Sequence, residues 1–514
     1  MQSVQKPHII LIYPKTGMDF GSTVAPPHAV LTVAAPVDKE GYRVAILDQR
    51  VQRIAEDDLA PLISDDLICV GISSMTGTQI KNSLKIAGIV RTLTDGKVPI
   101  VWGGTHPTVL PEQTLKHDLV DIVVVGEGEH PFLDLVRALE KKRPLLGIQG
   151  VAFKDGGRIF RNENRPLMDV NDILPVPWHL VEVEKYIHRD MYVKDRRRVM
   201  DIGQTSRGCP FKCGFCSSAS IRSRKWRAKS VENSLDQIIG TVRRFNLDGF
   251  WLRDDEFYID RRRAHAIFEG MIREKLDVSF YTSGTRVDVF LKATDEELLT
   301  MKRAGAHTLK FGAESGSQRI LDLMQKGITP EMTLEVNQRC KRLGVTPGYG
   351  IVIGYPTDTF KDIDTTIDFA YRLKRENKAA QLETFAQYTA LPGTPSWALA
   401  IEHGLKPPES LEGWTEWLYD DYDFEGKKLP WFTSDERVWL GNISYMSILA
   451  NGLVNALDSI RSDTLRRLAK MMSGPTSWYF KNRLVTKSYK RVPELGLIRY
   501  LRHRIFYDSE KTIY

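Results

Sequence analysis

The first 145 residues alternate between short apolar runs and longer amphipathic stretches. The apolar runs cover residues 8–14, 67–74, 98–104 and 121–126, and amphipathic stretches cover residues 27–41, 78–94 and 132–142. Short apolar runs are typical of buried strands, and an apolar spacing of three or four is typical of helices. The pattern therefore predicts a Rossmann-like (flavodoxin-like) α/β unit over residues 1–145, with a parallel sheet between two helix layers.

Small and polar residues follow these predicted strands, at the edge where parallel sheets bind ligands. No Gly-x-Gly-x-x-Gly or Gly-x-x-x-x-Gly-Lys motif follows the first strand, which argues against a dinucleotide or a P-loop nucleotide. Small residues at this edge would let a flat, bulky ligand approach the backbone. The candidate ligand contacts are Ser73, Ser74, Met75, Gly103, Gly104, Thr105, Glu127 and Gly128.

A second strand–helix alternation runs over residues 199–400. Its six units predict a partial (β/α)6 barrel of the TIM type, with its chemistry at the carboxyl ends of the strands. Residues 146–198 contain a predicted hairpin that turns at Asp155-Gly156-Gly157 and are otherwise rich in proline, so we expect a linker there. Residues 401–514 are expected to form a mainly helical region that closes the barrel and lines the substrate site.

Composition favours a large soluble protein of a reducing compartment. Of the 514 residues, 42% are hydrophobic and 27% are charged. The chain enters an apolar strand without a signal peptide, and no apolar run approaches the ~18 residues that a membrane span requires. Five cysteines are too few, and odd in number, for a disulfide framework. We therefore expect a cytoplasmic protein.

The net charge of +7 is distributed unevenly. Residues 461–505 contain 12 Lys and Arg against two acidic residues, Asp463 and Glu494. The simplest interpretation of this stretch is a solvated basic face. The alternative is a surface for an acidic substrate or for anionic lipid, which would allow weak peripheral membrane contact.

Three cysteines lie close together, at Cys209, Cys213 and Cys216. Structural zinc almost always takes four protein ligands, and a disulfide would leave one thiol unpaired. A 4Fe–4S cluster held by three thiolates leaves one iron open, which suits a cluster that binds a substrate or cofactor. The spacing therefore favours a cluster.

The Cys-x-x-x-Cys-x-x-Cys spacing, with Phe215 before the last cysteine, resembles the radical S-adenosylmethionine (radical SAM) superfamily. The resemblance implies a 4Fe–4S cluster on the three cysteines and SAM bound beside it. The implied SAM contacts are Asp254, Asp255 and Glu256 for the amino group, Glu314 and Ser315 for the ribose, Lys326 for the carboxylate, and Ile353 and Gly354 for adenine. Arg286, at the end of the third predicted strand, is a further candidate cofactor contact. Helix capping by the aspartates and a helix C-terminal charge at Lys326 are the structural alternatives.

Residues 25–48, 103–113 and 121–136 resemble the cobalamin-binding domain found ahead of radical SAM domains. Cobalamin-dependent mutases place a cobalt-ligating histidine in an Asp-x-His-x-x-Gly motif after the second strand. Here residues 48–53 read Asp-Gln-Arg-Val-Gln-Arg, so this loop supplies no lower histidine ligand. His106 is not expected to ligate cobalt either. A module that kept the fold and lost the cofactor is the alternative.

The resemblance covers about residues 1–400 and implies an enzyme that uses the cluster, SAM and cobalamin. Its commonest outcome is a C-methyltransferase that methylates an unactivated carbon. An oxidative cyclase or ring-rearranging enzyme, as in the anaerobic magnesium-protoporphyrin ester cyclase, shares the domain order, and a cobalamin-binding sensor with a vestigial barrel is a third alternative. The implied partners are a small-molecule substrate (a lipid, tetrapyrrole or natural-product intermediate) and a one-electron reductant such as flavodoxin or ferredoxin. No nucleic acid is expected.

Overall fold

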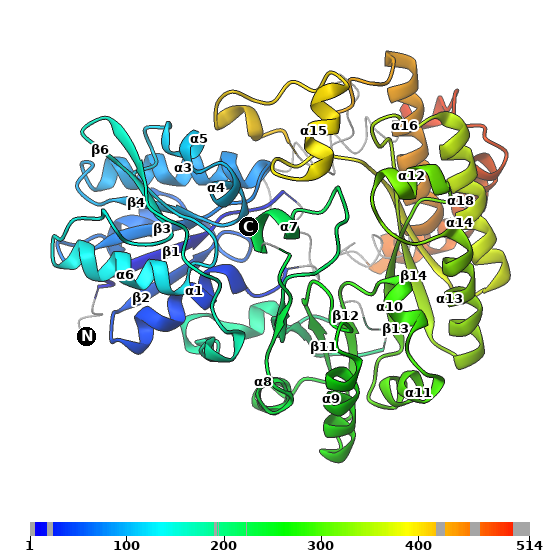
Figure 1. The fold of residues 1–514 in the computed structure, drawn as a ribbon, viewed down its shortest axis with the longest axis horizontal. Helices are drawn as coiled ribbons and strands as arrows, with labels where there is room; N and C mark the ends of the chain where they lie inside the picture. Colours follow the sequence, from blue (N-terminus) through cyan, green and yellow to red (C-terminus); the bar gives the residue numbers. More distant parts are fainter. Residues whose placement is uncertain are drawn as a thin grey trace.

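The computed structural model describes residues 6–17, 24–189, 193, 195–222, 224–417, 427–452 and 463–496. Figure 1 shows two α/β units side by side, the N-terminal unit in blue and cyan and the barrel in green. The C-terminal helices α16 and α18 pack against the barrel on the side away from the N-terminal unit. The predicted fold class is confirmed.

A seven-stranded sheet forms the N-terminal unit, in the order β2-β1-β3-β4-β5-β6-β7. Its first five strands are parallel, and β6 and β7 add an antiparallel hairpin at one edge. The strands are β1 Ile9–Tyr13, β2 Val44–Asp48, β3 Cys69–Ser73, β4 Ile100–Gly103, β5 Ile122–Val124, β6 Val151–Asp155 and β7 Arg158–Arg161. The hairpin predicted from Asp155-Gly156-Gly157 is confirmed, and it extends the sheet into the region assigned to the linker.

Both faces of this sheet are covered, because its strands are apolar on both sides. In β1, Ile9 and Leu11 pack on the α1 and α6 face, whereas Ile10 and Ile12 pack on the α3 face. The helices are α1 His28–Lys39, α2 Glu56–Leu59, α3 Thr78–Leu93, α4 Thr105–Val109, α5 Pro111–Leu115 and α6 Glu129–Glu140. Short 3-10 turns follow at η2 Ala60–Leu62, η3 Val170–Asp172, η4 Trp178–Leu180 and η5 Val183–Tyr186.

Six parallel strands form the partial barrel as two three-stranded sheets, β12-β11-β8 and β13-β14-β15. The strands are β8 Val199–Asp201, β11 Gly249–Leu252, β12 Ser279–Thr282, β13 Thr308–Glu314, β14 Thr346–Ile353 and β15 Gln381–Gln387. The surrounding helices are α8 Val231–Arg244, α9 Arg261–Arg273, α10 Val287–Leu291, α11 Asp295–Arg303, α12 Gln318–Leu323, α13 Pro330–Leu343 and α14 Phe360–Glu376.

Side-chain alternation defines the inner face of the barrel. Phe311 of β13 packs edge-on against Phe290 of α10, and Tyr349 of β14 donates its hydroxyl to Asn337 of α13 at 3.1 Å. These side chains point outward to the helices. Their neighbours in each strand, which include Gly312 and Gly350, therefore face the inside of the barrel.

The C-terminal region is mainly helical, as predicted. It comprises α15 Pro395–Glu402, the turn η6 Glu412–Trp414, α16 Ser434–Ser447, the π-helical turn η7 Ile448–Gly452 and α18 Asp463–Val485. Leu440 and Ile443 of α16 and Phe480 of α18 belong to the barrel's hydrophobic core. Within the described parts of the chain, no helix is both long and apolar enough to cross a bilayer.

Residues 391–417, named the strap here, return from the barrel to the N-terminal unit. The Ser396 backbone N–H donates to the Gly214 carbonyl oxygen at 2.9 Å. Farther along, the Trp414 indole N–H donates to Gln113 Oε1 at 2.7 Å, and Gln113 Nε2 donates to the Pro408 carbonyl at 2.8 Å. Helix α15 of the strap lies between the two units in Figure 1.

Candidate active site

The three cysteines lie on one loop, residues 208–226, whose ends are joined by β9 (Ser206–Arg207) and β10 (Arg227–Ala228). These two antiparallel strands are named the neck. Gly208 starts the loop at φ +83°, and a Cβ there would collide with the Lys225 carbonyl oxygen, so this position requires glycine. Helix α7, Ser218–Arg222, follows the last cysteine. The neck therefore presents all three thiols from one closed loop.

The surroundings of the cysteines suit thiolates shielded from water. Arg286 donates from Nη1 to Cys213 Sγ at 3.1 Å, and its guanidinium lies 3.7 Å from the centre of the Phe211 ring. Burial raises the pKa of Cys209 to about 11 and also raises the pKa of Cys216. Thiols with such pKa values ionise when iron binds them, and Arg286 places a cation beside Cys213.

A single metal ion does not suit the described residues, since no three of their His, Cys, Asp or Glu side chains form a group that would hold one. A cubane makes a different demand, because each thiolate binds a separate iron. The other two cysteines, Cys69 and Cys340, are fully buried in the cores of the two units. The residues present therefore fit a cluster with three protein thiolates.

A buried ion pair lies beside the cysteine loop. Lys326 donates to Glu314 Oε1 at 2.6 Å, and Lys326 Nζ lies 5.5 Å from the centre of the Phe215 ring. Burial disfavours the charged lysine, but Glu314 and Cys213 outweigh it and raise the pKa of Lys326. Gly312 makes room for the pair, because a Cβ there would lie 2.7 Å from Nζ and closer still to the carboxylate.

The backbone at the end of β13 is irregular where it supplies Glu314. The pairing of β13 with β14 shifts register between Gly312 and Glu314, and Glu314 has φ +59°. The Ser315 hydroxyl lies 2.9 Å from the Thr366 hydroxyl and accepts the Ser317 N–H at 3.1 Å. Ser315 is thus engaged in the turn that aims the Glu314 carboxylate at Lys326.

Asp254 and Asp255, which follow β11, hold the neck of the cysteine loop. Asp254 accepts hydrogen bonds from the Thr205 backbone N–H at 3.2 Å and from the hydroxyls of Thr205 and Ser206. Asp255 accepts from the Gly208 N–H at 2.8 Å. These contacts place both aspartates next to the cluster loop.

Glu256 and Arg286 are also brought together beside the cysteine loop. Glu256 accepts from the Arg286 backbone N–H at 2.9 Å, and burial raises the pKa of Glu256 to about 8. The Arg286 side chain also pairs with Asp288 at 2.8 Å and donates to the Lys326 carbonyl at 2.6 Å. Arg286 therefore connects a cysteine, the helix before Lys326 and the Glu256 loop.

Ile353 and Gly354 end β14. The Ile353 side chain is buried, and its carbonyl accepts the Tyr388 N–H at 2.9 Å. The Gly354 N–H donates to Asp358 at 2.9 Å, and its carbonyl accepts the Trp431 indole N–H at 3.2 Å. These backbone groups already have hydrogen-bond partners in the protein, so adenine would make van der Waals contact with this strand end.

The carboxyl edge of the N-terminal sheet is open at its glycines. A Cβ at Gly103 or Gly126 would meet no atom within 4 Å, and the Met75 side chain is 39% exposed. Gly104 has φ +104° because the turn runs against the Ser74 carbonyl, where a Cβ would lie 2.6 Å away. Ser73 and Ser74 are buried, and the exposed Thr105 starts α4. This open, partly apolar edge fits a flat ligand such as cobalamin.

Glu127 and Gly128 lie on the same edge, after β5. Glu127 forms a bidentate ion pair with Arg227 of the neck, at 2.6 and 3.0 Å. Gly128 packs under Val33, where a Cβ would lie 3.0 Å from a methyl group. The Glu127 carboxylate therefore faces the barrel, and the two arginines of the neck are site residues that the sequence analysis did not single out.

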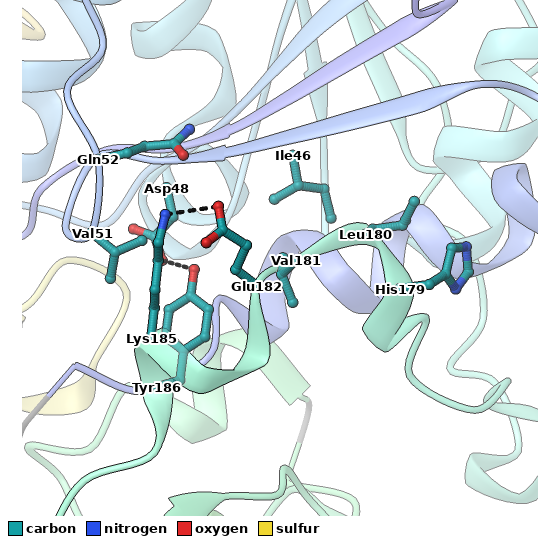
Figure 2. Close-up of a pocket in the computed structure, with 10 residues that line it drawn as sticks. All are labelled: Ile46, Asp48, Val51, Gln52, His179, Leu180, Val181, Glu182, Lys185 and Tyr186. Atoms are coloured by element: carbon teal, nitrogen blue, oxygen red, sulfur yellow. Dashed lines mark hydrogen bonds and ion pairs between the residues drawn. The ribbon is translucent and has the colours of Figure 1, made fainter. Parts of the chain in front are cut away.

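The loop after β2 is closed by its own arginine. Arg50 pairs with Asp48 at 2.7 Å, donates to the Ala25 carbonyl at 2.7 Å, and lies 4.2 Å from the centre of the Tyr13 ring. Figure 2 shows the Tyr186 hydroxyl directed at Asp48, beside a polar cavity of about 230 Å³ between β2 and the η4–η5 segment. Arg50 stands at the sequence position where the Asp-x-His-x-x-Gly motif has its histidine, and its guanidinium binds Asp48 and the Ala25 carbonyl.

His106 is held in a neutral, enclosed position. Its Nδ1 lies 3.0 Å from the Thr76 hydroxyl, and the Trp414 ring of the strap packs edge-on against it at 5.5 Å. Burial lowers the pKa of His106 to about 4. The packing of Trp414 on His106 had no signal in the sequence, because 308 positions separate them in the chain.

Family models match both units. Residues 204–370 match the Radical SAM superfamily, and residues 22–136 match the B12 binding domain. These matches imply a 4Fe–4S cluster and SAM for the barrel and cobalamin for the N-terminal unit, in agreement with the predicted cofactors.

Known proteins resemble most of the chain. It is 32% identical to the uncharacterized methyltransferase PH0819 of Pyrococcus horikoshii, over 85% of this chain and 92% of that protein. It is 29% identical to the anaerobic magnesium-protoporphyrin IX monomethyl ester cyclase of Rubrivivax gelatinosus, over 71% of this chain and 65% of that protein. The fold matches the structure of the cobalamin-dependent S-adenosylmethionine radical enzyme OxsB with a TM-score of 0.72, at 18% identity, over 97% of this chain and 75% of that one. The chain therefore belongs to the cobalamin-binding branch of the radical SAM enzymes.

Proposed function

We propose that the protein is a C-methyltransferase that methylates an unactivated carbon of a small-molecule substrate. Arg227 of the neck and Glu127 bring the cysteine loop into direct contact with the carboxyl edge of the N-terminal sheet, called the cobalamin edge here, and this contact supports a reaction that uses both units. When bound, the cluster and SAM supply a radical that takes a hydrogen atom from carbon, and cobalamin supplies the methyl group. The observation that carries methyl transfer is the 32% identity to PH0819, which is itself named a methyltransferase.

In this proposal the protein's own residues hold and orient the reactants. Cys209, Cys213 and Cys216 hold the cluster. The Glu314–Lys326 pair and Arg286 would orient the polar groups of SAM, because a buried lysine and arginine suit its carboxylate. Asp254, Asp255 and Glu256 keep the neck and Arg286 in place, and Met75, Gly103 and Gly126 leave room for the corrin.

An oxidative or ring-forming reaction is the second candidate. The 29% identity to the magnesium-protoporphyrin ester cyclase favours it, because that match covers 71% of this chain. Both candidates share the cluster, SAM and cobalamin, and they differ in whether a methyl group reaches the substrate.

Anaerobic reconstitution with iron, sulfide, cobalamin, methyl-labelled SAM and a reductant separates the candidates. Label in the substrate indicates methyl transfer, whereas 5′-deoxyadenosine without transferred label indicates cyclisation or oxidation. Cys213→Ala should abolish SAM cleavage, and Cys340→Ala, which removes a buried thiol of the barrel core, is the matched control. Cleavage by Cys213→Ala at the rate of Cys340→Ala would contradict the cluster assignment.

The enzyme works on a small molecule with a one-electron reductant. The finer proposal is that the reductant is a flavodoxin or ferredoxin, that the enzyme acts in the cytoplasm without nucleic acid, and that it contacts membranes weakly. The last part is supported by α18, where Met471, Trp478 and Val485 recur every seven residues and are 76%, 65% and 39% exposed. Exposed Arg467 and Lys481 lie on the same helix, and such a face suits anionic lipid.

Flotation with phosphatidylglycerol vesicles tests the membrane contact. Wild type should float with these vesicles and not with phosphatidylcholine vesicles, and Trp478→Ala should reduce flotation. Leu146→Ala removes a side chain that is 70% exposed on the N-terminal unit and should change nothing. Equal flotation of Trp478→Ala and Leu146→Ala would contradict the assignment of α18.

A further inference from the structure

Two glutamates of the N-terminal unit form ion pairs with the two arginines in the neck of the cysteine loop. Arg207 and Arg227 are direct partners across the β9–β10 pair, at the two ends of the loop. Arg207 donates from Nη2 to Glu129 at 2.6 Å, and Arg227 forms the bidentate pair with Glu127. Arg207 also lies 3.5 Å from Glu127, so the four side chains form one network, named the clamp here.

The clamp holds one side of the neck, and contacts from the barrel hold the opposite side. Successive side chains of β9 point to opposite sides, so Ser206 donates to Asp254 of the barrel while Arg207 pairs with Glu129 of the N-terminal unit. The next residue, Gly208, donates its N–H to Asp255. The neck is therefore held on one side by the carboxylates after β11 and on the other by those after β5.

The clamp is buried and electrically balanced. Its side chains are 6% to 16% exposed, and two guanidinium groups face two carboxylates. Charges removed from water in this way are tolerated only when each keeps its partner. Removing one carboxylate would leave a buried guanidinium without full compensation, and the neck would have to move to reach another acceptor.

Geometry also ties the clamp to the cobalamin edge. Glu127 lies between Gly126, where the edge is open, and Gly128, and Glu129 begins α6 directly afterwards. A displacement of this loop would therefore move the open edge and the neck together. Since bidentate arginine–carboxylate pairs restrict orientation as well as distance, the clamp sets both between the two units.

We propose that Glu127 and Glu129 are positioning residues that fix the cysteine loop of the barrel relative to the cobalamin edge, by holding Arg207 and Arg227 at its neck. The expected effect on the product ratio rests on the proposed methyl transfer, because a radical formed at one unit must meet a methyl donor held on the other. The described ion pairs of both glutamates go to the arginines of the neck, so their effect on the cysteines passes through the neck.

The variant Glu129→Gln removes one charge and keeps the side-chain shape. We expect it to retain iron and cobalamin, to alter the electron paramagnetic resonance spectrum of the reduced cluster with SAM, and to raise at least tenfold the ratio of 5′-deoxyadenosine to methylated product. Amide hydrogen exchange in residues 206–228 should also rise. The matched control is Glu112→Gln, which breaks an exposed pair with Arg161 at 2.8 Å in the same unit and should leave all of these readouts unchanged.

The double variant Glu129→Gln/Arg207→Gln separates positioning from stability. It removes the uncompensated charge, so its unfolding temperature should return toward wild type while the product ratio stays raised. Recovery of both, or a Glu129→Gln enzyme identical to Glu112→Gln, would overturn the proposal. If no methylated product forms in any variant but the cluster spectrum and exchange still respond to Glu129→Gln, methyl transfer is refuted and the clamp stands.

Discussion

Replacing Gly312 with alanine tests whether the Glu314–Lys326 pair orients SAM. Gly312 faces the inside of the barrel directly beneath this pair. The new methyl group would lie 2.7 Å from Lys326 Nζ and closer to the Glu314 carboxylate, well inside van der Waals contact. Both side chains would have to shift, and the 2.6 Å bond between them would lengthen or break.

Two free-energy costs set the range of the expected loss of SAM affinity. Overpacking a filled interior costs about 1–3 kcal/mol when neighbouring side chains can shift. Loss of a partner from a buried ion pair costs about 3–5 kcal/mol. If about 1.4 to 4 kcal/mol of this cost falls on SAM binding, affinity for SAM drops about tenfold to a thousandfold.

Equilibrium dialysis with labelled SAM, on enzyme reconstituted to equal iron and sulfide content, measures this loss. The matched control is Gly350→Ala, which also adds a methyl group to the inner face but meets nothing nearer than Glu383 Oε2 at 3.7 Å. The control should bind SAM like wild type. Equal affinities for Gly312→Ala and Gly350→Ala would refute the assignment of the Glu314–Lys326 pair to SAM.

Three further substitutions probe other parts of the structure. Burial raises the pKa of Asp358 to about 7, whereas an aspartate of the unfolded chain loses its proton near pH 4. Between these pH values the folded protein binds one more proton than the unfolded chain, so wild-type stability should fall as pH rises from about 4 to 7. Asp358→Asn should flatten this fall in thermal unfolding scans, and equal pH slopes would argue against it. Arg286→Lys cannot serve Asp288, Cys213 and the Lys326 carbonyl together, so 5′-deoxyadenosine formation should slow at least tenfold; an unchanged rate would remove Arg286 from the site. Trp414→Phe loses the bond to Gln113 and should cost about 1 kcal/mol in chemical denaturation, whereas a change near zero would show that the strap is held by other contacts.

Local patterns were sufficient for the strands, the order of the two units and the cysteine loop. The apolar runs became β1, β3, β4 and β5 because a strand buried on both faces needs an uninterrupted apolar sequence. The spacing of the three cysteines was likewise a local feature, and it pointed to a cluster before any fold was known.

Contacts between residues far apart in the chain could not be predicted from local patterns in the same way. Arg207 and Glu129 are 78 positions apart, and nothing near either residue marks the other as its partner. Asp254 illustrates a different point. Its place after a strand suggested a cofactor contact, which stays a prediction, and nothing in the sequence indicated its hydrogen bonds to Thr205 and Ser206. Charged residues at strand ends indicate a binding edge, but the partner of each residue can be identified only in the folded chain.

The strap has a consequence for the order of events during synthesis. Trp414 closes on Gln113, a residue made 301 positions earlier. At about 5–20 residues per second, the N-terminal unit waits roughly 15 to 60 s on the ribosome for the segment that will cover His106. At the start of that interval its carboxyl edge faces solvent, because the neck, the barrel and the strap all come later in the chain. A large cofactor can therefore be loaded onto the nascent chain before the two units close around it.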